Sequence, residues 1–116
     1  MVCAVLPLET IYNGRDNSIQ YVLLDNNNPV VDLSSLTKVV FKIGTTTIDS
    51  TAVGSNVIWW TDQTDYFGIT TDIVSAALGG QGLTAGNYPN SRITVYDPAN
   101  TNGIVWSNAL NIRVVD

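Results

Sequence analysis

The sequence Asp-Pro-Ala-Asn-Thr-Asn-Gly, which ends at Gly103, comes closer than any other stretch of this chain to the residue types of a metal site. A calcium loop of the EF-hand type needs oxygen ligands at alternate positions and a Gly at the sixth. Counted back from Gly103, two Asn residues fit, but the first ligand position falls on Pro98, and Asp97 lies one place too early. Asp-Pro and Asn-Gly are turn-forming pairs. The pattern therefore predicts the bend between two strands, and Asp-Asn-Asn-Asn-Pro at 25–29 predicts a second one.

Acid–base and nucleophilic chemistry has few candidate residues here. The chain has no His and a single Cys, Cys3, which excludes Ser-His-Asp triads, Cys-His pairs and zinc sites built from His or several Cys. Of its ten carboxylates, nine are Asp. Asp62 and Asp65 could serve as general acid and base, but Thr-Asp-Gln-Thr-Asp-Tyr is more typical of a turn. We therefore expect no catalytic residues, no cofactor, no metal site and a protein that is not an enzyme.

Aromatic residues between positions 59 and 67 offer binding chemistry instead. Trp59 and Trp60 are adjacent, so in a strand they face opposite sides, and only one can enter a core. The other Trp could anchor a subunit interface, where Trp and Tyr are enriched. It could also stack on a sugar ring, as in carbohydrate-binding modules, or only cover a sheet edge. These interpretations stay open, and Trp59, Trp60 and Tyr66 are candidate interface residues.

The charge distribution argues against nucleic acid and membranes as partners. The net charge is −5, and the five basic residues are scattered, whereas phosphate binding requires clustered Lys and Arg. No run approaches the roughly 18 apolar residues of a membrane span, and the N-terminus lacks the basic region of a signal peptide. Only 13% of the residues are charged, against about 25% in average domains. Either other subunits cover much of the surface, or Thr, Ser and Asn coat the strands.

Strict alternation of apolar and polar residues predicts the strands that would position these side chains. Three segments alternate in this way: 38–44, 91–97 and 109–115. Runs of β-branched and aromatic residues predict three more strands, at 18–25, 45–50 and 56–61.

Two segments have some helical character. The segment 71–80 has a capping residue and a Gly stop, but we favour a strand to about Ile73 followed by a turn. The segment 32–36 could form a single helical turn that links two sheets.

Seven or so short strands separated by turn signals predict an all-β fold, an antiparallel β-sandwich formed as one domain by residues 11–116. Gly86-Asn87-Tyr88, just before the penultimate strand, is typical of a tyrosine corner, in which the Tyr88 hydroxyl bonds to nearby backbone. Leu83 would then close the end of the core.

Residues 1–10 precede the first strand as an extended N-terminal arm. The arm is mostly apolar, and its Pro suits an edge strand or an extended segment. It could cross the edge of its own domain or lie on a neighbouring subunit, and we favour the second. Its candidate interface residues are Val2, Val5, Leu6 and Leu8.

Several stretches resemble a known family. GTTTIDS (44–50), GLTAGNYPNSRITVYDPANTNGIVW (82–106) and LNIRVV (110–115) resemble the small Ig-like β-sandwich proteins of tailed bacteriophages, in which a strand ending in Tyr-Asp-Pro leads into the final strand. The segment 12–41 is similar to their first strands. The resemblance implies an Ig-like sandwich and a structural virion protein on the capsid surface.

The role that this resemblance implies is that of a head decoration (cement) protein. Its partner would be the major capsid protein and, as a further option, copies of itself. A tail or baseplate accessory protein is the alternative that the resemblance leaves open. The resemblance implies no catalytic residues.

Overall fold

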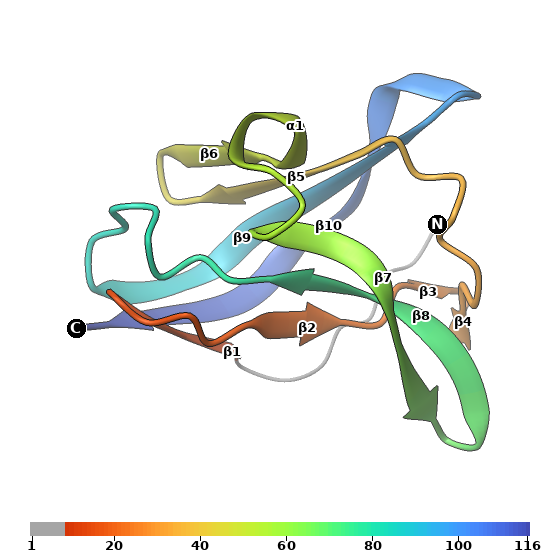
Figure 1. Ribbon diagram of the computed structural model, residues 1–116, viewed down its shortest axis with the longest axis horizontal. Coiled ribbons are helices and arrows are strands. Elements are labelled where there is room, and N and C mark those ends of the chain that lie inside the picture. The colour runs from red at the N-terminus through yellow and green to blue at the C-terminus, as the bar shows by residue number, and fades with distance from the viewer. Residues whose placement is uncertain (1–8) are drawn as a thin grey trace.

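Two main β-sheets and a small hairpin make up residues 9–116, the part of the chain that the computed structural model describes (Figure 1). The first sheet has the strand order β1-β10-β9-β5-β6, and the second has the order β2-β8-β7. The strands are β1 (Glu9–Tyr12), β2 (Ile19–Tyr21), β3 (Leu24–Asp25), β4 (Asn28–Pro29), β5 (Lys38–Ile43), β6 (Thr46–Asp49), β7 (Ile58–Tyr66), β8 (Ile69–Ala76), β9 (Gly86–Asp97) and β10 (Asn100–Val115). One short helix, α1 (Ser50–Val53), follows β6.

Neighbouring strands are antiparallel throughout, except that β1 runs parallel to β10. The fold is therefore nearly all-β, as predicted, although it has ten strands within residues 9–116 instead of about seven. The difference comes from short strands such as β3 and β4, of two residues each. β1 begins at Glu9, so the last two residues assigned to the arm belong to a sheet. The interface residues predicted at positions 2, 5, 6 and 8 lie outside the described residues.

The core lies between the two main sheets, because the alternating strands turn their apolar residues toward one another. In β5, Val39, Phe41 and Ile43 are buried, as the alternation predicted. β9 and β10 contribute their alternating apolar residues in the same way, and residues of β2, β7 and β8 meet them from the second sheet. The ring centroids of Tyr21 on β2 and Phe41 on β5 are 5.9 Å apart at the centre of this core. One hydrophobic core thus joins both sheets.

Three local predictions are wrong. β8 continues as a strand beyond Ile73, because Val74 and Ala76 are buried and pair with β2. The expected turn therefore comes later, and no helix forms there. The segment 32–36 is a non-helical turn in which the Leu36 amide donates to the Leu33 carbonyl at 3.1 Å. The predicted strand at 18–25 is interrupted, since β2 ends at Tyr21 and the chain then leaves the sheet to form β3.

The Tyr88 hydroxyl donates to the Thr84 carbonyl oxygen at 2.5 Å, which confirms the predicted bond to nearby backbone. Its ring lies against Gly44, where an added Cβ would come within 2.9 Å of a ring carbon. Leu83 is 5% exposed and packs into the core, as predicted. The loop before β9 is therefore fixed to the end of the core by one hydrogen bond and one apolar side chain.

The stretch around Asp97 is the bend between β9 and β10, as its turn chemistry predicted. Asp97 pairs with Asn100, and its Oδ1 accepts hydrogen bonds from the Ala99 amide and from the backbone and side chain of Asn100. Gly103 adopts a φ of +82°, and an added Cβ would lie 2.6 Å from a ring atom of Tyr96. The carboxylate and the glycine thus shape the hairpin.

Candidate functional site

Strand β7 carries all three of the candidate aromatic residues that the structure describes. A bulge interrupts the strand near its start, because Trp59 pairs with Ser75 on β8 while Asp62 pairs with Ile73. From the first pair to the second, β7 advances by three residues and β8 by only two. The extra residue in β7 forms the bulge and bends the strand. The bulge separates the Trp pair from the rest of β7, so the candidate residues do not form one continuous row.

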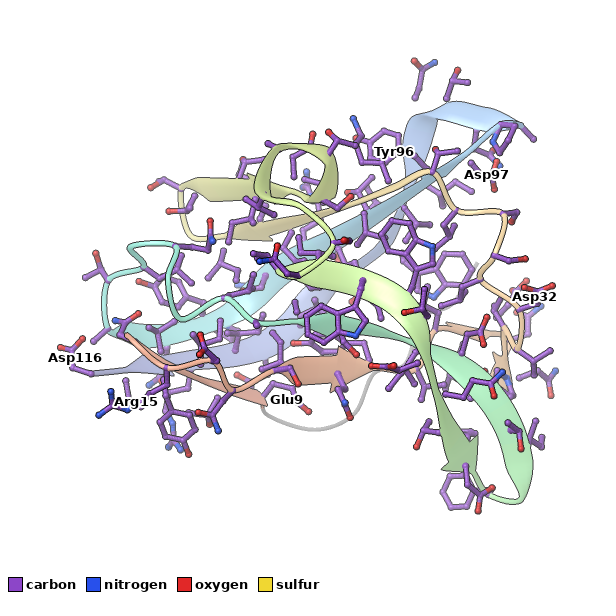
Figure 2. The ribbon with its side chains drawn as sticks, viewed as in Figure 1. Glu9, Arg15, Asp32, Tyr96, Asp97 and Asp116 are labelled. Atoms are coloured by element: carbon purple, nitrogen blue, oxygen red, sulfur yellow. The ribbon has the colours of Figure 1, made fainter. Side chains whose placement is uncertain are left out.

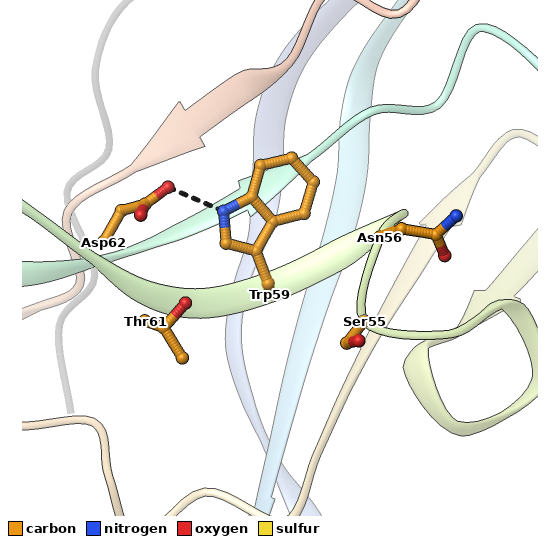
Figure 3. A pocket seen from close by; sticks show the side chains of 5 residues that line it. All are labelled: Ser55, Asn56, Trp59, Thr61 and Asp62. Atoms are coloured by element: carbon orange, nitrogen blue, oxygen red, sulfur yellow. Dashed lines mark hydrogen bonds between the residues drawn. The ribbon is translucent and has the colours of Figure 1, made fainter.

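Trp59 is half-buried and lines a shallow hollow of about 360 Å³ with Ser55, Asn56, Thr61 and Asp62 (Figure 3). Its indole Nε1 donates to Asp62 Oδ2 at 2.7 Å. Among the described residues that line this hollow, Trp59 alone is aromatic. The hollow thus offers one indole face surrounded by small polar groups.

Trp60 and Tyr66 have different surroundings. Trp60 packs against the main core but stays half-buried, and together with Trp59 it lines a smaller hollow of about 190 Å³. Tyr66, at the far end of β7, packs against a second, smaller cluster made by Val22, Leu24 and Ile73. Trp59 and Tyr66 are seven positions apart on β7, which corresponds to roughly 20 Å. The structure therefore brings neither Trp into contact with Tyr66.

The turn between β7 and β8 presents an apolar group that the sequence analysis did not include among the interface candidates. Phe67 and Gly68 form a two-residue loop between Tyr66 and Ile69. Phe67 is 90% exposed and Ile69 is 45% exposed. The rings of Tyr66 and Phe67 meet edge to face, with centroids 4.8 Å apart. The Phe-Gly pair between two alternating runs was the available signal, since two-residue loops ending in Gly are typical of hairpins.

The carboxylates do not assemble into a reactive centre. Asp62 and Asp65 are three residues apart on one strand, so their side chains leave it on opposite faces, and Asp62 already accepts the Trp59 N–H. Within residues 9–116 no group of three or more Cys, Asp or Glu residues is placed to hold a metal ion. None of the helices in this part of the chain is long and apolar enough to cross a membrane.

The most strongly perturbed side chain among the described residues is a core residue. Burial raises the pKa of the Tyr21 hydroxyl far above its usual value, and the nearby Glu9 carboxylate raises it further. Burial also raises the pKa of Glu9, although a hydrogen bond with the Gln20 backbone acts in the opposite direction. Both shifts follow from packing between β1 and β2, away from the exposed part of β7.

A second hollow, of about 260 Å³, lies beside the β9–β10 bend. Trp106 lines it and is 8% exposed, and its indole Nε1 is buried without a hydrogen-bond partner among the described residues. Asp32 and Asp97 line the same hollow and lie on the same side of the molecule (Figure 2). The floor is aliphatic, with Leu23, Leu33 and Val95 buried.

Comparison with known proteins does not place this chain in a family: no family model, curated protein or solved structure matches it.

Proposed function

We propose that this chain is a non-enzymatic structural protein of a tailed-phage virion, an Ig-like sandwich that decorates the head by binding the major capsid protein. The resemblance of the sequence to small Ig-like phage proteins motivates the virion role. The observation that carries the proposal is the strand order of the two sheets, together with the hydrogen bond of Tyr88.

The strand order supports an Ig-like arrangement when the strands are matched in sequence to those of Ig domains. In that fold, strands B, E and D lie in one sheet, strands C, F and G lie in the other, and variable-type domains add C′ beside C. The orders β2-β8-β7 and β10-β9-β5-β6 correspond to B-E-D and G-F-C-C′. β1 departs from the constant-type order, because it pairs with β10 instead of β2.

Two further features agree with this match. Tyr88 lies near the start of β9, the counterpart of strand F, where Ig-like domains place a tyrosine corner. Antibody domains pack a Trp of strand C against a disulfide between strands B and F. Here Phe41 of β5 packs against Tyr21 of β2, and Ile93 of β9 is buried in the same core. An aromatic pair thus occupies the region that the disulfide and the Trp fill in antibodies.

A decoration protein would stabilise the shell by bridging neighbouring capsid subunits. It would bury surface that is free in the unassembled state, and it would shift the equilibrium toward the assembled shell by mass action. The low fraction of charged residues and the apolar end of the β7–β8 hairpin suit such a contact.

The test is cosedimentation of the purified protein with heads prepared without it, followed by imaging of the decorated particle. Saturable binding at symmetric positions on the shell is expected. Binding confined to tails or baseplates would support the accessory role instead, and failure to bind any part of the virion would refute the proposal.

The hollow at Trp59 supports a second candidate function, recognition of a host-surface glycan by stacking on the indole. Trp59→Ala would then abolish binding of the particle to host cells while the protein still bound heads. Unchanged adsorption of particles that carry Trp59→Ala would exclude this function.

A further inference from the structure

The β7–β8 turn holds a large apolar side chain in a backbone conformation that such residues rarely adopt. Phe67 has a φ of +48° and Gly68 a φ of +85°. Positive φ at both central residues is the pattern of a type I′ turn, which favours Asn or Gly at the first position. For other L-residues this left-handed conformation is strained, because Cβ comes too close to the following carbonyl oxygen. Folding alone does not account for Phe67, since the side chain is 90% exposed and buries little area in return.

The hairpin that carries Phe67 is anchored at its base. Tyr66 packs against the second cluster, which includes Leu24 and Ile73, and its ring supports Phe67 edge to face. The Asp72 carboxylate accepts a hydrogen bond from the Leu33 amide at 2.9 Å, and the Asp72 amide donates to the Val31 carbonyl. The turn projects beyond the two sheets (Figure 1). Phe67 is therefore presented to solvent on a supported strand pair, which lowers the entropy cost of binding.

The charge around the turn indicates the chemistry of its partner. Strands β7 and β8 together carry three Asp residues and no Lys or Arg. Two of these, Asp62 and Asp65, lie on β7 and are exposed. Arg15 lies at the other end of the molecule (Figure 2). The end of the hairpin is thus apolar and its flanks are acidic, so a complementary surface combines an apolar pocket with Lys or Arg at its rim.

We propose that Phe67 is an anchor residue that inserts, with Ile69 beside it, into an apolar pocket with a basic rim on a partner protein. This inference deepens the proposed function and depends on it for the identity of the partner, the major capsid protein. An anionic lipid surface does not fit, because it repels the acidic flanks. A second copy of this chain does not fit either. The β5–β9 face does carry a hollow of about 470 Å³ beside Lys38, but the Lys38 ammonium already pairs with Asp49 at 3.6 Å, and Asp97 lines the same hollow, so its rim is not basic.

The decisive variant is Phe67→Asn, which removes the aromatic ring and supplies a residue that suits the turn. The expected result is a loss of affinity for heads prepared without this protein of about tenfold or more, as for an aromatic anchor at the centre of an interface. The denaturation midpoint should stay the same or rise. A residue with only a structural role would give the opposite pattern, a lower midpoint with unchanged affinity.

A matched control is Val105→Thr, which alters another exposed apolar side chain, 50% exposed on β10. It should leave the affinity for heads unchanged. Asp65→Lys tests the basic rim, because the Asp65 carboxylate makes no hydrogen bond or ion pair with the other described residues. It should weaken binding several-fold at low ionic strength and much less at about 0.5 M salt, where charges are screened over a few ångströms.

The outcomes separate this inference from the proposed function. If the unaltered protein does not bind heads, the proposed function fails. If it binds and Phe67→Asn binds equally well, the anchor inference is wrong and the contact lies elsewhere. Two further results would also overturn the inference: concentration-dependent self-association that Phe67→Asn abolishes, which would identify a second copy as the partner, and Phe67-dependent binding to phosphatidylserine vesicles, which would identify a membrane.

Discussion

The β3–β4 and β7–β8 hairpins have the same turn geometry and opposite surface chemistry. Each closes with a two-residue loop whose residues both have positive φ: Asn26 and Asn27 in one, Phe67 and Gly68 in the other. The Asn pair is what the backbone prefers, because Asn tolerates the left-handed region. In the second turn, backbone preference and residue type agree at Gly68 and conflict at Phe67. Turn geometry alone therefore does not explain Phe67, and its exposed ring needs a reason outside the fold.

The two hairpins also share a base. A substitution in this base is expected to change the free energy of unfolding more than any other variant proposed below. Leu24 of β3 and Ile73 of β8 belong to one buried cluster, against which Tyr66 packs. Ile73→Ala should lower the free energy of unfolding by about 2–4 kcal/mol, because it leaves a cavity between the hairpins. Chemical denaturation would measure this loss, and amide exchange should quicken in both hairpins together. Faster exchange in only one of them would show that they do not share a base. Thr70→Ala, at an exposed position of β8, is the control and should change stability by less than about 0.5 kcal/mol.

A substitution at Gly68 tests whether the second position of the β7–β8 turn requires a residue that accepts positive φ. An added Cβ would meet nothing within 4 Å, so Gly68→Ala introduces backbone strain without a clash. The expected loss is about 1–2 kcal/mol in the free energy of unfolding. Asn27→Gly at the equivalent position should change stability by only a few tenths of a kcal/mol, because both residues accept positive φ. Equal losses in the two variants would contradict the shared turn type.

Exchanging the residues at the first turn position, Asn26 and Phe67, tests directly whether Phe is strained in this backbone conformation. Asn26→Phe should lower the free energy of unfolding by about 1 kcal/mol, since it imposes the strain of Phe67 on a turn that lacks it. Phe67→Asn should not lower it, because the relief of strain offsets the lost edge contact with Tyr66. Denaturation midpoints of the two variants, measured at one pH, would decide. A clear loss in Phe67→Asn would mean that the ring stabilises the fold.

The smallest expected effect is a local dependence on pH near the β3–β4 hairpin. Hydrogen bonds from the Ser34 side chain and amide lower the pKa of Asp32 below its usual 3.8. Because the folded-state pKa is lowered, the contribution of this turn is present above the usual value and is lost as pH falls through the lowered pKa. The Ser34 amide resonance should therefore titrate below pH 3.8. Asp32→Asn should abolish this titration and leave the resonances of Phe67 and Gly68 unchanged.

The sequence predicted those parts of the fold that depend on residues close together in the chain. Alternation identified β5, β9 and β10, and the residues before Tyr88 indicated its hydrogen bond to nearby backbone. It did not predict the break after Tyr21, because the chain leaves the sheet there to form a hairpin whose base is completed by Ile73, far along the sequence. Periodicity carries no information about such distant partners.

The candidate site was only partly predictable for the same reason. Strand geometry alone predicted that one of two adjacent Trp residues would meet the core, and Trp60 does pack against it. The bulge was not predictable, and next to it Trp60 stays half-buried and shares a hollow with Trp59. Phe67 was missed because Phe is not a turn residue, so Tyr-Phe-Gly-Ile-Thr fits a continuous strand as well as it fits a turn. Gly68 was the one local sign of a turn, but the positive φ of Phe67 opposes the preference of that residue and is visible only once the backbone is known.

The parallel pairing of β1 with β10 determines how the domain bears mechanical load. Glu9 pairs with Ile112, and Tyr12 pairs with Val115. A force that pulls on Glu9 and on Asp116 therefore acts on opposite ends of this strand pair. It slides one strand along the other and strains their hydrogen bonds together, whereas a peeling force would break them one after another. Held by its two ends, the domain should resist stretching until that whole ladder ruptures in one step.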